Sequence, residues 1–255
     1  KLINFQYGYP NMETVLPTVA LILMLAVPIV TMKSFAEERH QKTDLLLYTL
    51  PLKTSQIVLG KYLAMMTVFA IPTVIMMFYP IVMSMYGTVS FLATYTSILA
   101  FYLLCAAMVA ICMFMSSLTE SQIIAAVLGV TALVVCYAST LLAGALPDTA
   151  IASYIAFTVL ICLIALAVYY FVRNYWIAFT TAVVLEAGIL IVYLSDNSIF
   201  AGLFQKFVTA ISIFDALNSF VTNQLVDMTV IIYYLSIAFL FCFLTVQSVE
   251  KRRWS

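Results

Sequence analysis

The chain alternates long apolar runs with short polar segments. Seven of the apolar runs are long enough to cross a bilayer as a helix, which takes about 17–25 residues. They cover residues 14–32, 57–86, 91–115, 120–143, 150–171, 177–194 and 229–247. The run 57–86 is longer than a hydrocarbon core of about 30 Å and should bend at Pro72 or Pro80. The pattern predicts an all-α polytopic membrane protein with a single transmembrane domain over residues 1–255.

Residues 33–56 form the first polar interruption, and they contain a predicted helix. Five of their side chains recur at spacings of three and four residues, the period of one helix face: Ala36, His40, Thr43, Leu47 and Leu50. Pro51 should end this helix, because proline disfavours helical backbone at the residue before it. Glu38 and Lys42 are spaced for an i,i+4 ion pair. We therefore expect an amphipathic helix that lies along the membrane surface.

Residues 195–228 form the second polar interruption and are too polar to cross the bilayer. Six apolar side chains nevertheless recur at near-helical spacing: Leu203, Phe207, Ile211, Phe214, Val221 and Leu225. This spacing predicts one or two amphipathic helices at the membrane surface, with Lys206, Asp215 and Asp227 on the wet side.

Composition supports a membrane protein. The chain is 65% hydrophobic and 9% charged, whereas a soluble domain carries roughly 25% charged residues. No basic tract indicates a nucleic-acid partner, so membrane lipids are the expected surroundings. The five cysteines all lie in apolar runs, where we expect them to be small packing residues.

The Lys and Arg residues indicate the orientation. If the stretch from Lys33 to Lys61 faces the cytoplasm, nine of the eleven Lys and Arg residues are inside, and the opposite orientation leaves two inside. The positive-inside rule therefore predicts a multi-pass membrane protein with a cytoplasmic C-terminus. The membrane we expect is the bacterial inner membrane. Residues 195–228 are then extracytoplasmic. Because the first residues would also lie outside, we expect a further crossing helix before them, which gives eight crossings.

Motifs for catalysis and cofactor binding are missing from the sequence. Gly60 and Lys61 are followed by Tyr62, where a phosphate-binding loop needs Ser or Thr. There is no Gly-x-Ser-x-Gly elbow, and the single histidine and the scattered acids form no metal-ligand cluster. We expect no catalytic residue, metal or cofactor in this chain.

Glu186 is a carboxylate near the middle of the run 177–194. A charge at such a depth costs roughly 2.5–3.5 kcal/mol on insertion scales. Two interpretations stay open. Glu186 is either a protonated, hydrogen-bonded packing residue or a polar point on a translocation path.

The segment AEERHQKTDLLLYTLPLKTSQIVLGKYLA, which starts at Ala36, resembles the loop after the second helix of type-2 ABC transporter permeases. The likeness lies in an acidic pair, a K-T-D/E-x-L-L-x-x-x-P run and an I-x-x-G-K sequence. The turn SSLTESQIIAA (116–126) and the terminal VQSVEKRRW (246–254) resemble the gliding-motility branch of these permeases.

This resemblance implies a permease subunit, expected to be an exporter, that dimerises with a second permease copy or homologue. ATP and Mg would bind to a separate cytoplasmic ABC ATPase, which contacts the loop helix in that family. Carried over to this chain, the ATPase-docking residues are Phe35, Glu37, Glu38, Arg39, Lys42, Asp44 and Leu47. An accessory extracytoplasmic protein could also bind.

Two other functions stay open on the residues alone. An ion-coupled secondary transporter or channel would favour several intramembrane charges and inverted repeats, whereas the chain shows one central acid and no clear repeat. A non-transporting membrane scaffold would keep residues 33–56 as a docking site and make Glu186 dispensable. The sequence does not distinguish lipid, peptide, drug or polysaccharide as a substrate.

Overall fold

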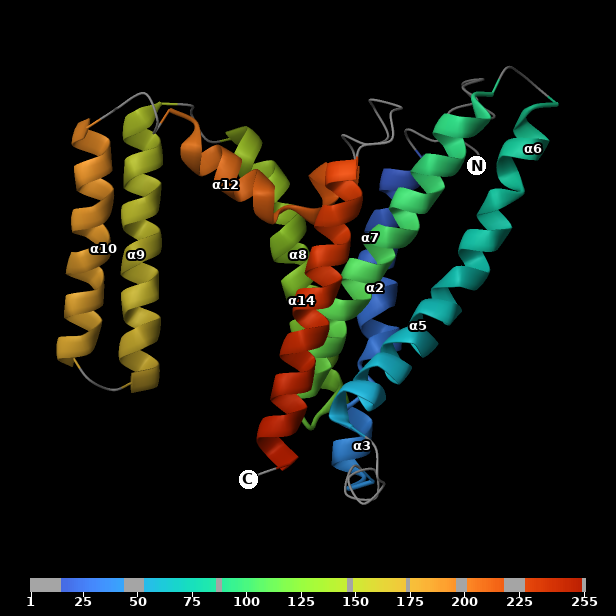
Figure 1. The fold of residues 1–255 in the computed structure, drawn as a ribbon, viewed down its shortest axis with the longest axis horizontal. Coiled ribbons are helices and arrows are strands. Elements are labelled where there is room, and N and C mark those ends of the chain that lie inside the picture. Colours follow the sequence, from blue (N-terminus) through green and yellow to red (C-terminus); the bar gives the residue numbers. More distant parts are fainter. Residues whose placement is uncertain are drawn as a thin grey trace. The chain divides into compact units, whose positions relative to one another are not determined.

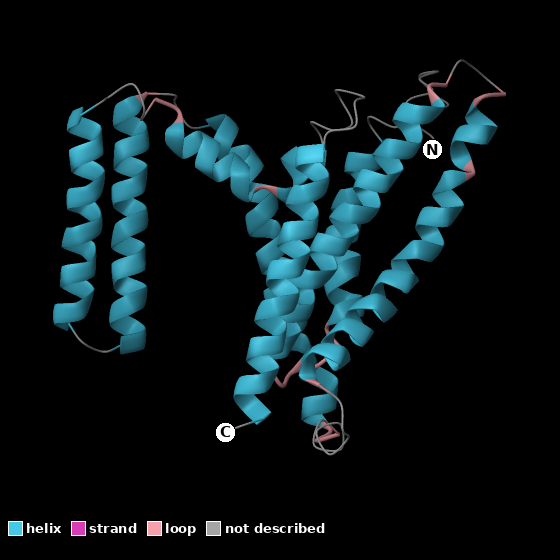
Figure 2. Cartoon of the chain, viewed as in Figure 1, coloured by secondary structure: helices cyan, strands magenta, loops and turns pink. Residues whose placement is uncertain are grey.

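The computed structural model describes residues 15–43, 53–85, 89–145, 149–172, 175–195, 201–217 and 228–253. All regular secondary structure in these ranges is helical, which confirms the predicted all-α class (Figure 2). The helices labelled in Figure 1 are α2 (Val15–Thr31), α3 (Ala36–His40), α5 (Thr54–Met77), α6 (Tyr79–Met83), α7 (Phe91–Leu118), α8 (Gln122–Ala145), α9 (Ala150–Val172), α10 (Tyr175–Ser195), α12 (Leu203–Ile211) and α14 (Met228–Arg253).

Five stretches within the described ranges are long and apolar enough to span a membrane. They are Val15–His40, Thr54–Met83, Phe91–Leu118, Gln122–Ser139 and Met228–Arg252. Each coincides with a predicted crossing. Helices α9 and α10 contain shorter apolar stretches, Ala150–Cys162 and Phe179–Leu190. The count of seven crossings therefore stays a prediction.

Contacts along the chain divide it into two compact units. Unit 1 is Lys1–Tyr137 with Ile213–Ser255, and unit 2 is Ala138–Ser212. Unit 1 contains α2, α3, α5, α6, α7 and α14 together with the first part of α8. Unit 2 contains α9, α10 and α12.

Helix α7 is the centre of unit 1. It packs against α2, α5 and α14. In its apolar 18-residue stretch 72% of the residues are buried, compared with 22–28% in the corresponding stretches of the other four candidate spans. Many of its buried side chains are small, which lets neighbouring helices approach closely. These small residues are Ala100, Cys105, Ala106, Ala107, Ala110, Cys112, Ser116 and Ser117. The largest side chains that are fully buried around this axis include Leu16, Val58, Leu104, Met108 and Tyr234.

Tyrosine hydroxyls tie α5 to α7 along much of their length. Each donates a hydrogen bond to a backbone carbonyl of the other helix: Tyr62 to Ala106 at 3.2 Å, Tyr102 to Met66 at 3.3 Å and Tyr95 to Met77 at 3.3 Å. An apolar bilayer offers a hydroxyl no other partner, so such interhelical bonds fix one helix against the next.

Helix α5 stops at Met77, and the chain resumes as the short helix α6. Pro80, in the first turn of α6, has no N–H to donate, and its ring would clash with the carbonyl four residues earlier. The N–H of Phe78 instead bonds the carbonyl of Ile75 at 3.2 Å. The bend predicted at Pro72 or Pro80 thus falls next to Pro80, while Pro72 lies within α5.

Two helices of unit 2, α9 and α10, lie side by side and run in opposite directions (Figure 1). Helix α12 packs on α9 through the ring of Phe157, whose centroid lies 5.1 Å from that of Phe204 and 5.9 Å from that of Phe207. Helix α12 falls within the predicted amphipathic stretch, and its Lys206 is exposed as expected. Val221, Leu225 and Asp227 lie outside the described residues.

Candidate functional site

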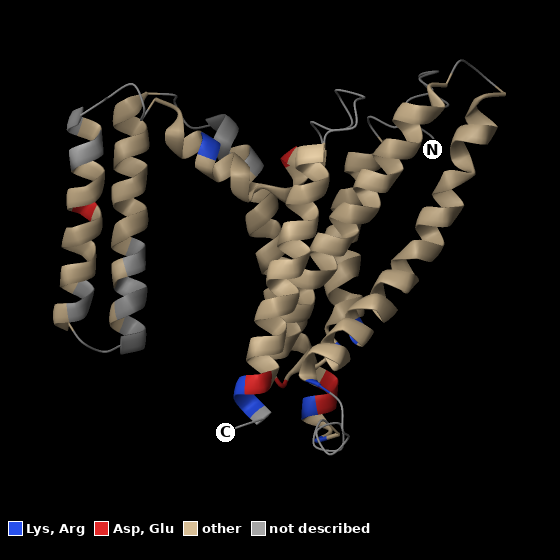
Figure 3. Cartoon of the chain, viewed as in Figure 1, with Lys and Arg blue, Asp and Glu red and all other residues tan. Residues whose placement is uncertain are grey.

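Charged residues gather at one end of unit 1, where α3 lies and where α14 finishes (Figure 3). Three segments that are far apart in the sequence meet there: residues 33–43, 116–121 and 248–252. We call this region the charged end. It contains most of the residues that sequence analysis marked for partner docking.

A side chain of α7 caps the start of α3. The first N–H groups of a helix have no partner within the helix. Here the N–H groups of Phe35 and Ala36 donate to the hydroxyl oxygen of Ser116, at 3.3 and 3.2 Å. The same hydroxyl donates to the carbonyl of Met32 at 3.0 Å, and Ser116 is fully buried. The end of α7 therefore positions both the end of α2 and the beginning of α3.

Arg39 makes a second connection between α3 and α7. Its Nη1 donates to the carbonyl oxygen of Ser117. The hydroxyl of Ser248 in α14 donates to the same oxygen at 3.3 Å. Arg39 is only 6% exposed. Arg39 therefore holds α3 in position, and it offers little surface to a partner.

Glu38 connects α3 to α5. Its Oε2 pairs with Nζ of Lys61, which also donates to the carbonyl of Ser34 and lies 4.3 Å from the ring centroid of Phe35. Both charged side chains are partly buried. The predicted pair of Glu38 with Lys42 is therefore wrong, because the carboxylate pairs with a lysine 23 residues away.

Helix α3 is shorter than predicted because the backbone turns at Lys42. This residue has a φ of 57°, in the left-handed region that ends helices. The N–H of Lys42 bonds the carbonyl of Arg39 at 3.1 Å, and the N–H of Thr43 bonds that of Glu38 at 2.9 Å. These two bonds form a Schellman motif. The expectation of a continuous helix through Thr43 is therefore wrong.

The predicted docking residues divide by exposure. Phe35 and Arg39 are buried, Glu37 and Glu38 are half-buried, and Lys42 is exposed. Asp44 and Leu47 lie outside the described residues. His40 is also exposed beside this set, although sequence analysis gave it no role. The surface that a partner could reach therefore lies around Glu37 and His40 of α3 and around Lys42 in the turn that follows it.

Glu120 and Arg252 complete the charged end. The Arg252 Nη1 atom lies 2.9 Å from the Glu120 Oε1 atom, and both side chains are exposed. Exposed pairs contribute little to stability because water and salt screen them. This pair still brings the last turn of α14 beside the segment between α7 and α8. Both segments stand out in the sequence, but no sequence pattern indicates that they meet.

Glu186 lies in unit 2, where α9 supplies its hydrogen-bond partners. The hydroxyl of Tyr154 donates to Glu186 Oε1 at 2.8 Å. The hydroxyl of Thr158 lies 3.1 Å from the same oxygen and 3.0 Å from the carbonyl of Tyr154. The ring of Tyr193 packs beside that of Tyr154, with centroids 4.9 Å apart. Glu186 is half-buried, so its carboxyl has partners but keeps an open side.

Metal binding finds no support in the described part of the chain. Nowhere in it do three or more His, Cys, Asp or Glu residues come together in an arrangement that could hold an ion. The charged end is built from ion pairs and capping hydrogen bonds.

Comparison with known protein families gives a match over most of the chain. The model of a family described as "ABC-2 family transporter protein" matches residues 2–178, more than two thirds of the chain. The matched region contains α3 with its Schellman motif, as well as the segment 116–121. No curated protein and no solved structure matches the chain.

Proposed function

The chain belongs to the ABC-2 family of transporter proteins, and from that premise we propose that it is the permease subunit of an ATP-driven exporter. In this proposal residues 33–56 dock a separate ATPase subunit. The observation that carries the proposal is the anchoring of α3. Its residues bond α7 through Arg39 and Ser116, and α5 through Lys61, and the Ser117 carbonyl joins it to α14.

The charged end faces the cytoplasm in this proposal, and with it the C-terminal turn of α14. The membrane is the bacterial inner membrane. This orientation places α3 where an ATPase subunit can reach it, and it agrees with the gathering of charges at one end of unit 1 (Figure 3). The likeness of residues 116–126 and 246–254 to the gliding-motility branch supports that branch as the subfamily.

The docking residues have two roles in this proposal. Phe35 and Arg39 are buried and hold α3 in place, while Glu37 and Lys42 contact the ATPase directly. Glu38 does both, since its carboxylate pairs with Lys61 and is still one third exposed. Asp44 and Leu47 extend the contact surface. The partner ATPase binds ATP and Mg, and this chain binds no cofactor.

A displacement of α3 would be passed on to several crossing helices together. Helices α2 and α5 flank the docking segment in the chain, and α7 and α14 hold it by hydrogen bonds. A second permease copy or homologue would carry an equivalent platform. Closure of the two ATPase subunits on ATP would then move both platforms and change the exposure of a pathway between the two permeases.

Glu186 is proposed as a polar point on the translocation path. Its hydrogen bonds from Tyr154 and Thr158 show how a carboxyl is accommodated between α9 and α10. The same carboxyl is the one feature that favours an ion-coupled secondary transporter as a second candidate. Such a transporter would depend on titration of Glu186, whereas the permease depends on α3.

The test is purification of the full-length chain from its native host in mild detergent. The number of copies of each co-purified protein per permease is then measured. We expect an ATPase at about one copy per permease. The double reversal of Glu37 and Glu38 should remove the ATPase and uncouple ATP hydrolysis from transport. Because Glu38 also holds Lys61, the sharper variant leaves Glu38 unchanged and reverses the charges of half-buried Glu37 and exposed Lys42, as Glu37→Arg with Lys42→Glu.

Lys206→Glu in α12 is the matched control, since Lys206 is exposed and lies outside the charged end. It should leave the ATPase bound. A wild-type chain that is purified without an ATPase would overturn the proposal. Loss of the ATPase in the control as well as in the docking variants would also contradict it, because docking would then not be local to α3.

A further inference from the structure

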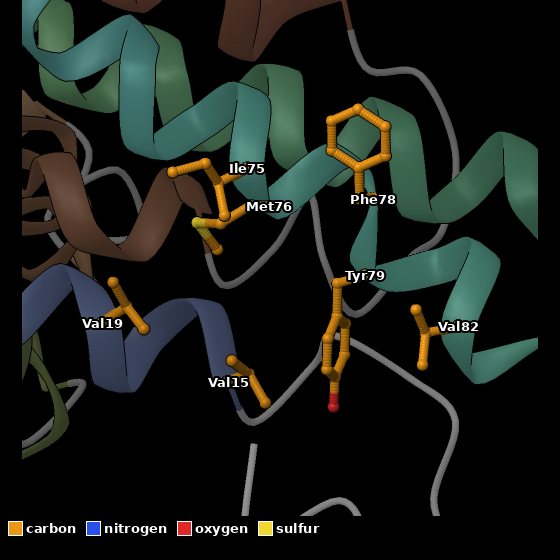
Figure 4. Close-up of a pocket in the computed structure, with 7 residues that line it drawn as sticks. All are labelled: Val15, Val19, Ile75, Met76, Phe78, Tyr79 and Val82. Carbon is orange, nitrogen blue, oxygen red and sulfur yellow. The ribbon is translucent and has the colours of Figure 1, made fainter.

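An apolar pocket lies in unit 1 at the far end of α2 and α5 from the charged end. Val15 and Val19 line it from α2, and the last turn of α5 and the helix α6 line it from the other side (Figure 4). Its volume is about 460 Å³. Seven described residues line it, and Tyr79 is the one among them with a polar side chain.

Tyr79 lies at the pocket because α5 breaks at Phe78. The break turns the chain into α6, and the ring of Tyr79 then points past Val15 (Figure 4). Its hydroxyl is buried and has no hydrogen-bond partner among the described residues. A buried hydroxyl without a partner is unfavourable, so this atom calls for an acceptor or donor from outside the described residues.

The mouth of the pocket faces an apolar surface. Ile75 and Phe78 are 66% and 63% exposed, and Val82 is 45% exposed. In a spanning helix such side chains contact lipid tails. Tyr79 lies close to the end of the apolar stretch Thr54–Met83, at the depth where tyrosine commonly meets the membrane–water interface. The ester groups of phospholipids lie at this same depth.

We propose that this pocket binds one acyl chain of a membrane phospholipid, with the Tyr79 hydroxyl donating to an ester carbonyl oxygen of that lipid. The occupant must be apolar along most of its length and carry an acceptor at one end, and an acyl ester meets both requirements. The apolar walls do not suit a charged or sugar-like ligand, since among the described lining residues only the hydroxyl of Tyr79 could pair with its polar groups.

The site is linked to α3 through the helices of its walls, and this part alone rests on the proposed function. The two helices that form its walls, α2 and α5, are the same two that hold the docking segment at their other ends. A change in their separation at α3 would change the width of the pocket about 25 Å away, the length of a helix such as α2.

The experiment uses the permease alone in phospholipid vesicles that contain a phospholipid with a photoreactive group on one acyl chain. Adducts are mapped by mass spectrometry. We expect adducts on residues 15–19 and 75–82 that saturate as the probe is increased. The substitution Val19→Trp, which fills the pocket, should abolish them. Ile71→Trp is the matched control, because Ile71 is 65% exposed on α5 and does not line the pocket.

A second measurement examines the hydrogen bond. The wild type should retain an ester-linked probe about two- to tenfold better than an ether-linked one, the factor that corresponds to one hydrogen bond. Tyr79→Phe should remove this preference. Because the preference is measured in the wild type, a variant that fails to fold does not remove the test.

The proposal is overturned if labelling of the pocket does not saturate, if Val19→Trp leaves it unchanged, or if the wild type retains both probes equally. Crosslinks that place residues 1–14 in the pocket and exclude the probe would also overturn it. None of these measurements uses an ATPase, so their failure is distinct from a failure of the docking proposal, which the purification tests.

Discussion

Arg39 in α3 and Ser117 at the end of α7 are joined by a hydrogen bond, although 78 residues separate them in the chain. The guanidinium donates to the Ser117 carbonyl oxygen, which also accepts a hydrogen bond from Ser248 in α14. One carbonyl of the central helix therefore holds two other segments of the charged end. Because Arg39 is buried, water does not compete strongly for this bond, and the position of α3 depends on it.

Replacement of Arg39 by Ala should destabilise unit 1. The substitution removes a charged donor from a buried carbonyl and leaves α3 without one of its bonds to α7, which should lower the free energy of unfolding by about 1–3 kcal/mol. Thermal unfolding in detergent measures the change. Ser248→Ala is the control, and its effect should be smaller because the hydroxyl is a neutral donor at 3.3 Å. Equal unfolding temperatures for the two variants would contradict this prediction.

Glu38 and Lys61 should be coupled energetically, since their ion pair connects α3 to α5. We expect Glu38→Gln and Lys61→Met each to lower stability, and the double variant to cost less than their sum by about 1 kcal/mol. A double-mutant cycle on thermal unfolding measures this interaction. In the proposed complex with an ATPase, either single variant should weaken the coupling between ATP hydrolysis and transport. Strict additivity of the two substitutions would show that the pair contributes nothing.

Replacement of Lys42 by glycine should suit the backbone conformation at this position but remove a charge that the ATPase needs for binding. A left-handed conformation costs an L-residue roughly 1–2 kcal/mol, so Lys42→Gly should raise the stability of the isolated permease by about 1 kcal/mol. The same substitution removes an exposed cation and should weaken binding of the ATPase. Unfolding temperature and ATPase co-purification should therefore change in opposite directions. If both decrease, the left-handed turn is not the source of strain.

The crossing helices could be predicted because hydropathy is a local property of the chain. Runs such as 91–115 are apolar whatever surrounds them. The break after α5 is local as well, because the ring of Pro80 itself disfavours a continuous helix. The length of α3 could not be predicted in this way. The periodicity from Ala36 to Leu50 favours a longer helix, and Lys42 is not a residue type that commonly adopts a positive φ.

The connections of the charged end could not be predicted either, because they join segments far apart in the sequence. Glu38 has an acceptable lysine at i+4, but Lys61 lies closer in space. Ser116 reads as part of a polar turn, and only the packing of α7 against α2 makes it the cap of α3. The pocket likewise depends on where the break after α5 directs Tyr79.

Gly129 in α8 should not accept a larger residue. A Cβ atom there would lie 3.2 Å from the Cβ of Pro28 in α2 and 3.5 Å from the sulfur of Cys112 in α7. We expect Gly129→Val to destabilise unit 1 by about 1–3 kcal/mol through overpacking. Gly60→Ala in α5 is the control, because a Cβ there meets nothing within 4 Å. It should raise the unfolding temperature, since alanine favours a helix over glycine. A stable Gly129→Val protein would show that α2 and α8 can separate.

We expect Glu186 to be needed for function and to lower the stability of the folded protein. A carboxyl is unfavourable in the membrane-spanning position proposed for α10, so Glu186→Leu should insert and should unfold at a temperature equal to or higher than that of the wild type. Glu186→Gln keeps an oxygen that can accept from Tyr154 and Thr158 and should leave the unfolding temperature unchanged. If the carboxyl lies on the translocation path, the Leu variant should fail to replace the wild-type gene in the native host while its ATPase still co-purifies. If the Leu variant is unstable and loses the ATPase, Glu186 is a packing residue. If the Leu variant is stable and fully active, Glu186 is dispensable.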